Sequence, residues 1–275
     1  MTRTVLSDTR FGELSDDAIA GDFRIWQRIR GHRYSLDDVA TAWEAAQLDL
    51  PPSPRLLDLG CGIGSVTLML AHAFPGAMIT GIEAQEISFE LAQRNITRNE
   101  LDPRVELVFG DLREVTKGME PQFDLVTGTP PYFDPQKSSP STDSQRTHAR
   151  IEMRGGIEAY LRAGAHGLSA SGRMVVCGDA RRPDRVQMGA NAAGLRLLAR
   201  RDVVPRAGKD ALFTIWTLAR SAGDAPSDAL FEHEPLVARD ENGARTEQAH
   251  ALRRFFGLEV NESEAPSPPL RVRGS

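Results

Sequence analysis

A glycine-rich turn with an acidic residue in front of it is the first feature of this sequence that could do chemistry. The stretch "LLDLGCGIGS" contains Asp58, and the glycines that follow are Gly60, Gly62 and Gly64. Such glycines let a ligand approach the backbone closely. Ser65 stands where the dinucleotide pattern G-x-G-x-x-G requires glycine, so a pyrophosphate is not favoured. A carboxylate at Asp58 would instead pair with the ammonium group of an amino acid.

Two further carboxylates end the next two apolar runs. Glu83 closes "AMITGIE", about 20 residues past the glycines, where a carboxylate can bind ribose hydroxyls. Asp111 follows "VELVFG" and can accept a hydrogen bond from an exocyclic adenine amine. Together with Asp58, they suit a nucleoside that has a cationic amino-acid tail and no phosphate. S-adenosyl-L-methionine (SAM) meets this description, and we expect it as the cofactor.

A rigid aromatic segment leaves the fourth apolar run, "FDLVTG". It consists of Thr129, Pro130, Pro131, Tyr132 and Phe133. The two prolines fix φ and remove two backbone donors, so the carbonyls of Thr129 and Pro130 have a preset geometry. The aromatic rings offer flat faces to a planar substrate. We predict that this segment orients a planar amine for reaction, with Thr129, Pro130, Pro131 and Tyr132 as the catalytic residues.

The elements that would position these residues alternate from residue 54 to 220. Short apolar runs separated by amphipathic stretches predict an α/β fold, with a Rossmann-like, mostly parallel sheet of seven strands. The last two runs are joined by a segment too short for a crossover helix, so we expect an antiparallel hairpin there. The expected parts are an N-terminal helical and basic element (1–50), the central domain (51–220), and a C-terminal extension with one helix and a disordered tail (221–275).

The whole pattern resembles the class I SAM-dependent methyltransferases. The strand-end segment is similar to the [N/D/S]-P-P-[Y/F] motif of members that methylate amino groups of nucleobases or the glutamine side-chain amide. Thr129 departs from this motif, because it offers a hydroxyl where asparagine offers a carbonyl acceptor.

Three other segments resemble the bacterial tRNA1(Val) N6-adenine methyltransferases. They are "QRIRGHRYSLDDVATAW" (27–43), "ARIE" (149–152) and "PRAGK" (205–209). The resemblance implies that Tyr34, Ser35 and Asp37 line the cofactor pocket together with Thr129. It also implies that Arg150 and Glu152 order the loop after the fourth strand.

Basic residues interleaved with aromatic ones predict an RNA-binding surface. Arg24, Arg28, Arg30, His32 and Arg33 surround Trp26 and Tyr34 in the sequence, and Arg206 and Lys209 would add to this patch across the site mouth. The expected substrate-binding residues are Phe133, Arg150, Arg206, Lys209, Arg30 and Arg33.

Composition sets the remaining expectations. The chain has 275 residues, a formal net charge of -5 and two cysteines that form no metal-ligand spacing. We therefore expect a cytoplasmic protein without a metal, as a monomer or weak dimer. No run approaches the ~18 apolar residues of a membrane span, so we expect no membrane contact.

These features favour a SAM-dependent methyltransferase that acts on the N6 amine of an adenine in tRNA. One alternative is an N-methyltransferase of a protein glutamine or a small planar amine, favoured by Thr129 and the acidic net charge. Another is a SAM-binding module without catalysis that serves a partner protein, for which Thr129 is the only support.

Overall fold

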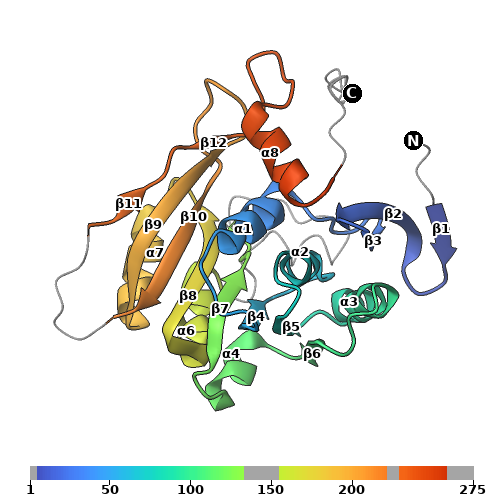
Figure 1. Ribbon diagram of the computed structural model, residues 1–275, viewed down its shortest axis with the longest axis horizontal. Coiled ribbons are helices and arrows are strands. Elements are labelled where there is room, and N and C mark those ends of the chain that lie inside the picture. The colour runs from blue at the N-terminus through green and yellow to red at the C-terminus, as the bar shows by residue number, and fades with distance from the viewer. Residues whose placement is uncertain (1–4, 133–154, 222–228, 259–275) are drawn as a thin grey trace, which may run out of the picture.

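The computed structural model describes residues 5–132, 155–221 and 229–258. Within them, a sheet of nine strands forms the centre, and a separate sheet of three strands lies beside it (Figure 1). The strands of the large sheet are β4 (Arg55–Leu59), β5 (Met78–Glu83), β6 (Val105–Phe109), β7 (Phe123–Gly128), β8 (Leu168–Asp179), β9 (Leu195–Val204), β10 (Phe213–Arg220), β11 (Phe231–Glu232) and β12 (Leu236–Val237).

The core of the large sheet is parallel. Strands β6, β5, β4, β7 and β8 lie side by side in this order. β10 runs antiparallel between β8 and β9. The predicted seven-stranded sheet with an antiparallel last hairpin is therefore confirmed. β11 and β12 add short parallel pairings to β9, which the sequence did not indicate.

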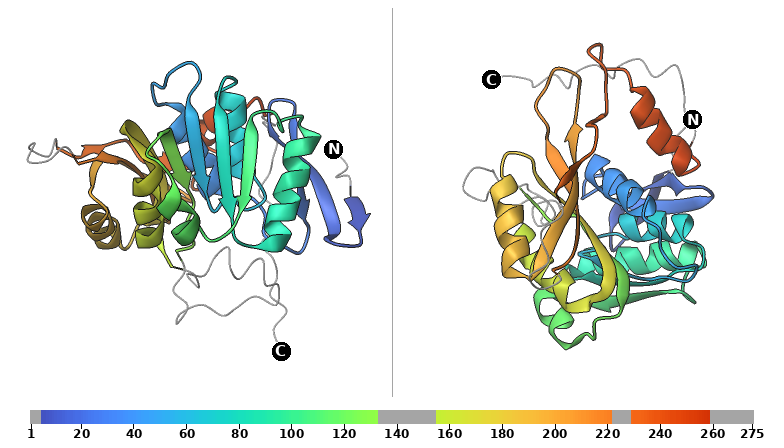
Figure 2. Two further views of the ribbon diagram at one scale, coloured as in Figure 1. Left: turned by 90° about the horizontal axis from the view of Figure 1, so that it is seen from below. Right: turned by 60° about the vertical axis from the view of Figure 1, so that its left-hand side comes forward.

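Helices cover both faces of the large sheet (Figure 2). One face carries α1 (Leu36–Ala46), α2 (Ser65–Ala73) and α3 (Glu86–Arg98), and the other carries α4 (Leu112–Val115), the 3-10 turn η1 (Thr116–Gly118), α6 (Ile157–Gly167) and α7 (Pro183–Ala192). Each face has its own apolar cluster, because successive strand residues point to opposite faces. Leu56 belongs to the first cluster and Leu57 to the second. None of the described helices is long and apolar enough to cross a membrane.

The strand register brings the predicted site residues to one edge. Leu59, the last residue of β4, lies opposite Ile82 on β5 and Gly128 on β7. The glycine-rich turn, Glu83 and Thr129 each follow these positions directly. Parallel strands thus deliver all three to the same carboxyl edge, where open α/β sheets bind ligands.

The N-terminal segment forms strands in front of the expected helix. β1 (Val5–Asp8), β2 (Gly12–Ala20) and β3 (Phe23–Arg28) pair antiparallel, and α1 follows as predicted. Two arginines of the basic stretch are paired with acids. The guanidinium of Arg24 lies 2.9 Å from the Asp16 carboxylate, and that of Arg33 lies 3.0 Å from the Asp17 carboxylate. The charges of these two arginines are therefore balanced within the segment.

The C-terminal extension packs against the N-terminal segment. Its predicted helix is present as α8 (Glu247–Phe255). Phe256 is fully buried, and its carbonyl accepts a hydrogen bond from the Gly21 N–H at 2.6 Å. Residues 229–258 are thus an integral part of the core, while the predicted disordered tail lies outside the described residues.

Truncating Phe256 tests this packing. Phe256→Ala should lower the free energy of unfolding by about 3 kcal/mol, because it removes a fully buried ring. The neighbouring Phe255 is 40% exposed, so Phe255→Ala should cost about 1 kcal/mol or less. Urea unfolding of both variants measures the difference, and equal losses would contradict a structural role for the extension.

Candidate active site

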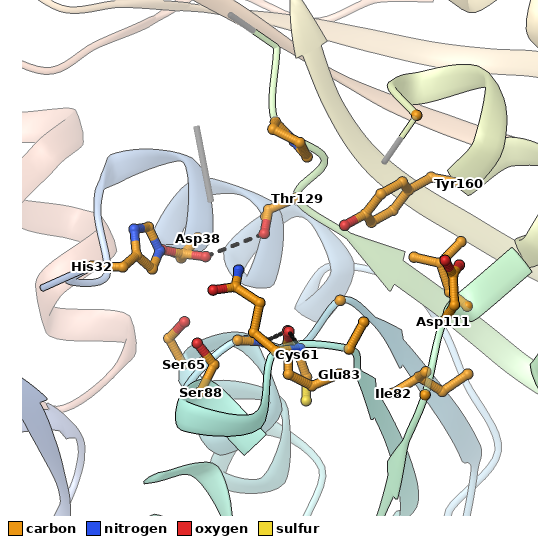
Figure 3. A pocket seen from close by; sticks show the side chains of 18 residues that line it. His32, Asp38, Cys61, Ser65, Ile82, Glu83, Ser88, Asp111, Thr129 and Tyr160 are labelled. Carbon is orange, nitrogen blue, oxygen red and sulfur yellow. Dashed lines mark hydrogen bonds between the residues drawn. The ribbon is translucent and has the colours of Figure 1, made fainter. Parts of the chain in front are cut away.

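A pocket lies where β4, β5, β6 and β7 end (Figure 3). Six of the residues predicted for the site line it: Gly60, Gly62, Glu83, Asp111, Thr129 and Pro131. Six polar residues that were not predicted to line it also do so: His32, Asp38, Ser65, Gln85, Ser88 and Tyr160. The pocket therefore combines strand ends with the starts of α1, α2 and α3.

The glycine-rich turn leaves space for a ligand against the backbone. Gly60 and Gly62 have φ values of 62° and 58°, which side chains rarely adopt. A Cβ at Gly60 would lie 2.3 Å from the Tyr160 hydroxyl, so nothing larger than glycine fits there. A Cβ at Gly62 would meet no atom within 4 Å and would occupy the pocket itself. The predicted Gly64 starts α2 and does not line the pocket.

Glu83 and Asp111 hold the positions that the sequence predicts. Glu83 Oε2 accepts the Gly62 N–H at 2.9 Å, and Oε1 accepts the Gln85 N–H at 2.6 Å. A carboxylate oxygen can accept more than one hydrogen bond, so Glu83 can also accept from ligand hydroxyls. Asp111 is oriented by Arg113. The backbone N–H of Arg113 donates to Oδ1 at 2.9 Å, and its guanidinium donates hydrogen bonds to both carboxylate oxygens. Both carboxylates are thus fixed before any ligand arrives.

Asp58 lies beneath the pocket rather than in its wall. It is 2% exposed, and its oxygens accept the hydroxyls of Thr67 at 2.7 Å and Thr127 at 3.0 Å. Burial raises the pKa of Asp58 to about 6, although the two hydroxyls act against this shift. Asp58 therefore links the glycine-rich turn to Thr67 and Thr127. Its buried position does not favour the direct contact with a ligand ammonium group that the sequence suggests.

Asp38 is the acidic residue that faces the pocket instead (Figure 3). Its Oδ2 accepts the Ser35 N–H at 2.9 Å, and its Oδ1 accepts the Thr129 hydroxyl at 3.3 Å. Burial, followed by the charge of Asp37, raises the pKa of Asp38 to about 8. The sequence does contain a signal for it, since Ser35-x-x-Asp38 has the spacing of a helix-start capping box.

The proline-aromatic segment divides between pocket and core. Thr129 and Pro131 line the pocket, whereas Pro130 is buried. The Tyr132 ring stacks on Phe213 with centroids 6.3 Å apart, and its hydroxyl lies 3.5 Å from Asp37 Oδ2. Burial raises the pKa of Tyr132. One face of this ring is therefore used inside the protein, which differs from the expectation that it lies open to a substrate.

The remaining predicted residues lie away from the pocket lining. Tyr34 and Asp37 do not line the pocket. The Tyr34 hydroxyl donates to the Ala18 carbonyl at 3.3 Å. Arg30, Arg33, Arg206 and Lys209 do not line it either. Phe133, Arg150 and Glu152 lie outside the described residues. The cofactor contacts of Tyr34 and Asp37, and the substrate and loop contacts expected of the others, stay predictions.

Tyr160 and Cys61 also line the pocket. Tyr160 comes from α6, 29 positions beyond Pro131, and no local motif marks it. Cys61 lies within the turn, and burial raises the pKa of its thiol, so it stays protonated. Nucleophilic catalysis by a thiolate is therefore disfavoured.

Comparison with known proteins agrees with this geometry. Residues 34–150 match the family described as methyltransferase small domain. A predicted O-methyltransferase from Agrobacterium tumefaciens has a similar structure, with a TM-score of 0.62 and 18% identity over 82% of this chain and 100% of the other. The chain therefore has the fold of the class I methyltransferases, and part of it resembles a methyltransferase family. The predicted fold class is thereby confirmed.

Two curated relatives of this chain differ in their named substrates. A tRNA1(Val) (adenine(37)-N6)-methyltransferase of Porphyromonas gingivalis is 33% identical over 50% of this chain and 53% of its own length. A ribosomal protein uL3 glutamine methyltransferase of Bradyrhizobium diazoefficiens is 29% identical over 57% of this chain and 43% of its own length. The chain thus spans about half the length of these relatives.

SAM is the methyl donor of class I methyltransferases, and the residues of this pocket fit it. The space at Gly62 admits a ligand against the backbone, and Glu83 presents oriented oxygens for two hydroxyls. Asp38 adds a buried carboxylate that accepts hydrogen bonds from two uncharged groups, the Ser35 N–H and the Thr129 hydroxyl. This combination suits a cationic nucleoside better than a phosphate-bearing one.

The raised pKa of Asp38 predicts how stability depends on pH. Because its folded value of about 8 exceeds the unfolded value of 3.8, its contribution is complete below about pH 4 and is lost as pH rises through 8. Asp38→Asn should therefore gain stability over wild type between pH 5.5 and pH 8, by about 1 kcal/mol or more. Urea unfolding of the ligand-free protein at both pH values measures this. A stability difference that is the same at both pH values would contradict the assignment.

Proposed function

We propose that this protein transfers the methyl group of SAM to the N6 amine of an adenine in tRNA. The observation that carries the proposal is the shared wall of the pocket. Thr129 and Pro131, from the segment that resembles the amine-methylating motif, line the same pocket as the glycine-rich turn and Glu83. An amine bound over this segment would lie next to a methyl donor held by the glycine-rich turn.

The cofactor would be held by groups that are already in place. Glu83 would accept the two ribose hydroxyls, and Asp111 would accept from the adenine amine, as the sequence predicts. Asp38 takes over from Asp58 as the proposed partner of the ammonium group, because it faces the pocket while Asp58 is held by two threonines. Bound SAM supplies an electrophilic methyl group.

Thr129 and Asp38 would together replace the acceptor that asparagine provides in the resembling motif. The Thr129 hydroxyl donates to Asp38 Oδ1, so its oxygen lone pairs remain available to an amine N–H. Such an acceptor pulls the amine hydrogens into place and increases the lone-pair character of the nitrogen. No strong base is required, because the methyl acceptor loses its proton only as the bond forms.

A glutamine amide is the second candidate substrate. The relative named as a glutamine methyltransferase favours it, and a planar amide could use the same acceptors. The named substrate of the tRNA relatives and the segments that resemble their family favour tRNA instead.

Methyl transfer from labelled SAM decides between these substrates. Purified tRNA, protein extract and small molecules from a strain lacking the gene serve as acceptors in parallel. We expect label in tRNA, recovered as N6-methyladenosine after digestion. Label confined to protein would establish the glutamine alternative, and SAM binding without any transfer would favour the non-catalytic module. Gly62→Val is the negative control, because its side chain would fill the pocket.

Tyr132 should act by holding the segment in position. Tyr132→Ala removes the ring that stacks on Phe213, so the transfer rate should fall about 100-fold while the Kd for SAM stays within about threefold. Tyr132→Phe keeps the ring and removes only a 3.5 Å hydroxyl contact, so it should transfer at close to the wild-type rate. Single-turnover rates and SAM titrations measure both effects. A wild-type rate in Tyr132→Ala would mean that the segment does not position the substrate.

A further inference from the structure

Tyr160 places a hydroxyl in the pocket to which the proposed function gives no role. The residue comes from α6 and is 9% exposed, and its hydroxyl points into the pocket (Figure 3). Among the residues that the structure describes, none forms a hydrogen bond with this hydroxyl. Buried tyrosine hydroxyls usually have a partner, so a bound ligand is the candidate for that partner.

The ring of Tyr160 fits against two glycines at the carboxyl edge of the sheet. A Cβ at Gly60 would lie 2.3 Å from the hydroxyl oxygen, and a Cβ at Gly128 would lie 2.7 Å from the ring atom Cδ1. Gly60 is the first glycine of the glycine-rich turn, and Gly128 directly precedes Thr129. The two strand ends are neighbours, because Leu59 pairs with Gly128. The hydroxyl therefore lies where the cofactor turn meets the substrate segment.

The charges around this hydroxyl determine what it can offer a ligand. Burial raises the pKa of Tyr160, and the negative charges of Glu83 and Asp58 raise it further, so the hydroxyl keeps its proton and cannot act as a base. A neutral hydroxyl has one proton and two oxygen lone pairs. The two carboxylates attract the proton end of the O–H dipole, which leaves oxygen lone pairs for a ligand.

The chemical order of groups in SAM favours its sulfur as the atom beside this oxygen. The sulfonium of SAM lies between its ribose and its amino-acid tail. Under the proposed function, Glu83 holds the ribose hydroxyls and Asp38 holds the ammonium group, so the sulfonium belongs in the part of the pocket between them. Its methyl group must also reach an amine over Thr129. Both conditions favour the region next to Gly60, where the Tyr160 oxygen lies.

We propose that the Tyr160 oxygen contacts the sulfonium of bound SAM and directs its methyl group towards the substrate segment. The inference rests on the placement of the cofactor in the proposed function. A lone pair attracts a positive charge, and this attraction is stronger in a pocket that excludes water. The product S-adenosylhomocysteine has a neutral sulfur and loses the attraction. Tyr160 would thus distinguish the methyl donor from the product.

The affinities of SAM and S-adenosylhomocysteine for Tyr160→Phe test the proposal. This substitution removes only the hydroxyl and keeps the ring against the two glycines. Isothermal titration calorimetry gives the Kd of each ligand, and thermal unfolding verifies that the variant is folded. Sinefungin, which carries an ammonium group in place of the methylated sulfur, is the third ligand. Tyr132→Phe is the matched control, because its hydroxyl lies 3.5 Å from Asp37 and Tyr132 does not line the pocket.

We expect Tyr160→Phe to bind SAM about 10-fold more weakly than wild type, with the Kd of S-adenosylhomocysteine within about twofold of the wild-type value. Sinefungin has its positive charge at the corresponding position, so its affinity should fall together with that of SAM. The ratio of the Kd values for SAM and S-adenosylhomocysteine in Tyr132→Phe should match the wild-type ratio.

The outcomes separate this inference from the proposed function. Equal losses for all three ligands would overturn the sulfonium contact, because the hydroxyl would then meet a part of the cofactor that they share. Unchanged affinities in Tyr160→Phe, or an equally changed ratio in Tyr132→Phe, would also overturn it. In each of these cases, methylation of tRNA by wild type would leave the proposed function standing. If wild type binds none of the three ligands, the cofactor placement and this inference fail together.

Discussion

A buried carboxylate joins three of the elements around the pocket. Asp58 on β4 accepts hydroxyls from Thr67 on α2 and Thr127 on β7, in a region where neither donor could reach water. Losing either partner would leave a buried polar group unsatisfied, which costs about 1–3 kcal/mol. Because α2 continues directly from the glycine-rich turn, these bonds fix the turn relative to the end of β7. The separation between cofactor space and substrate segment depends on them.

The same region concentrates negative charge in a poorly hydrated space. Asp38, Asp58 and Glu83 are all buried, and burial raises the pKa values of the first two. Without a cation, burial favours the protonated forms of Asp38 and Asp58. A positively charged ligand would favour ionisation and offset the repulsion, so the site selects for charge as well as shape. This constraint explains why the pocket contains carboxylates where a phosphate-binding turn would avoid them.

The features that repeat along the chain could be predicted from the sequence. Seven apolar runs gave the sheet, and Glu83 and Asp111 lie where their strand ends place them. The small sheet was missed because charged residues such as Asp16 and Arg24 pair across its strands and hide their apolar alternation. The role of Asp58 was missed for a different reason. Its partner Thr127 is 69 positions away, and only the finished sheet brings the two together.

The arrangement of β8, β9 and β10 also determines when the protein can become complete. β10 lies between β8 and β9, which both precede it in the chain. This part of the sheet therefore cannot form until residue 220 has been synthesised. The contact between Gly21 and Phe256 comes later still and joins segments near opposite ends of the sequence. Contacts between distant segments slow folding, since a long loop must close before they form. During synthesis, the parallel strands β4 to β8 would therefore exist for a time with one edge of β8 unpaired. An unpaired strand edge is prone to aggregation, and chaperones protect such intermediates.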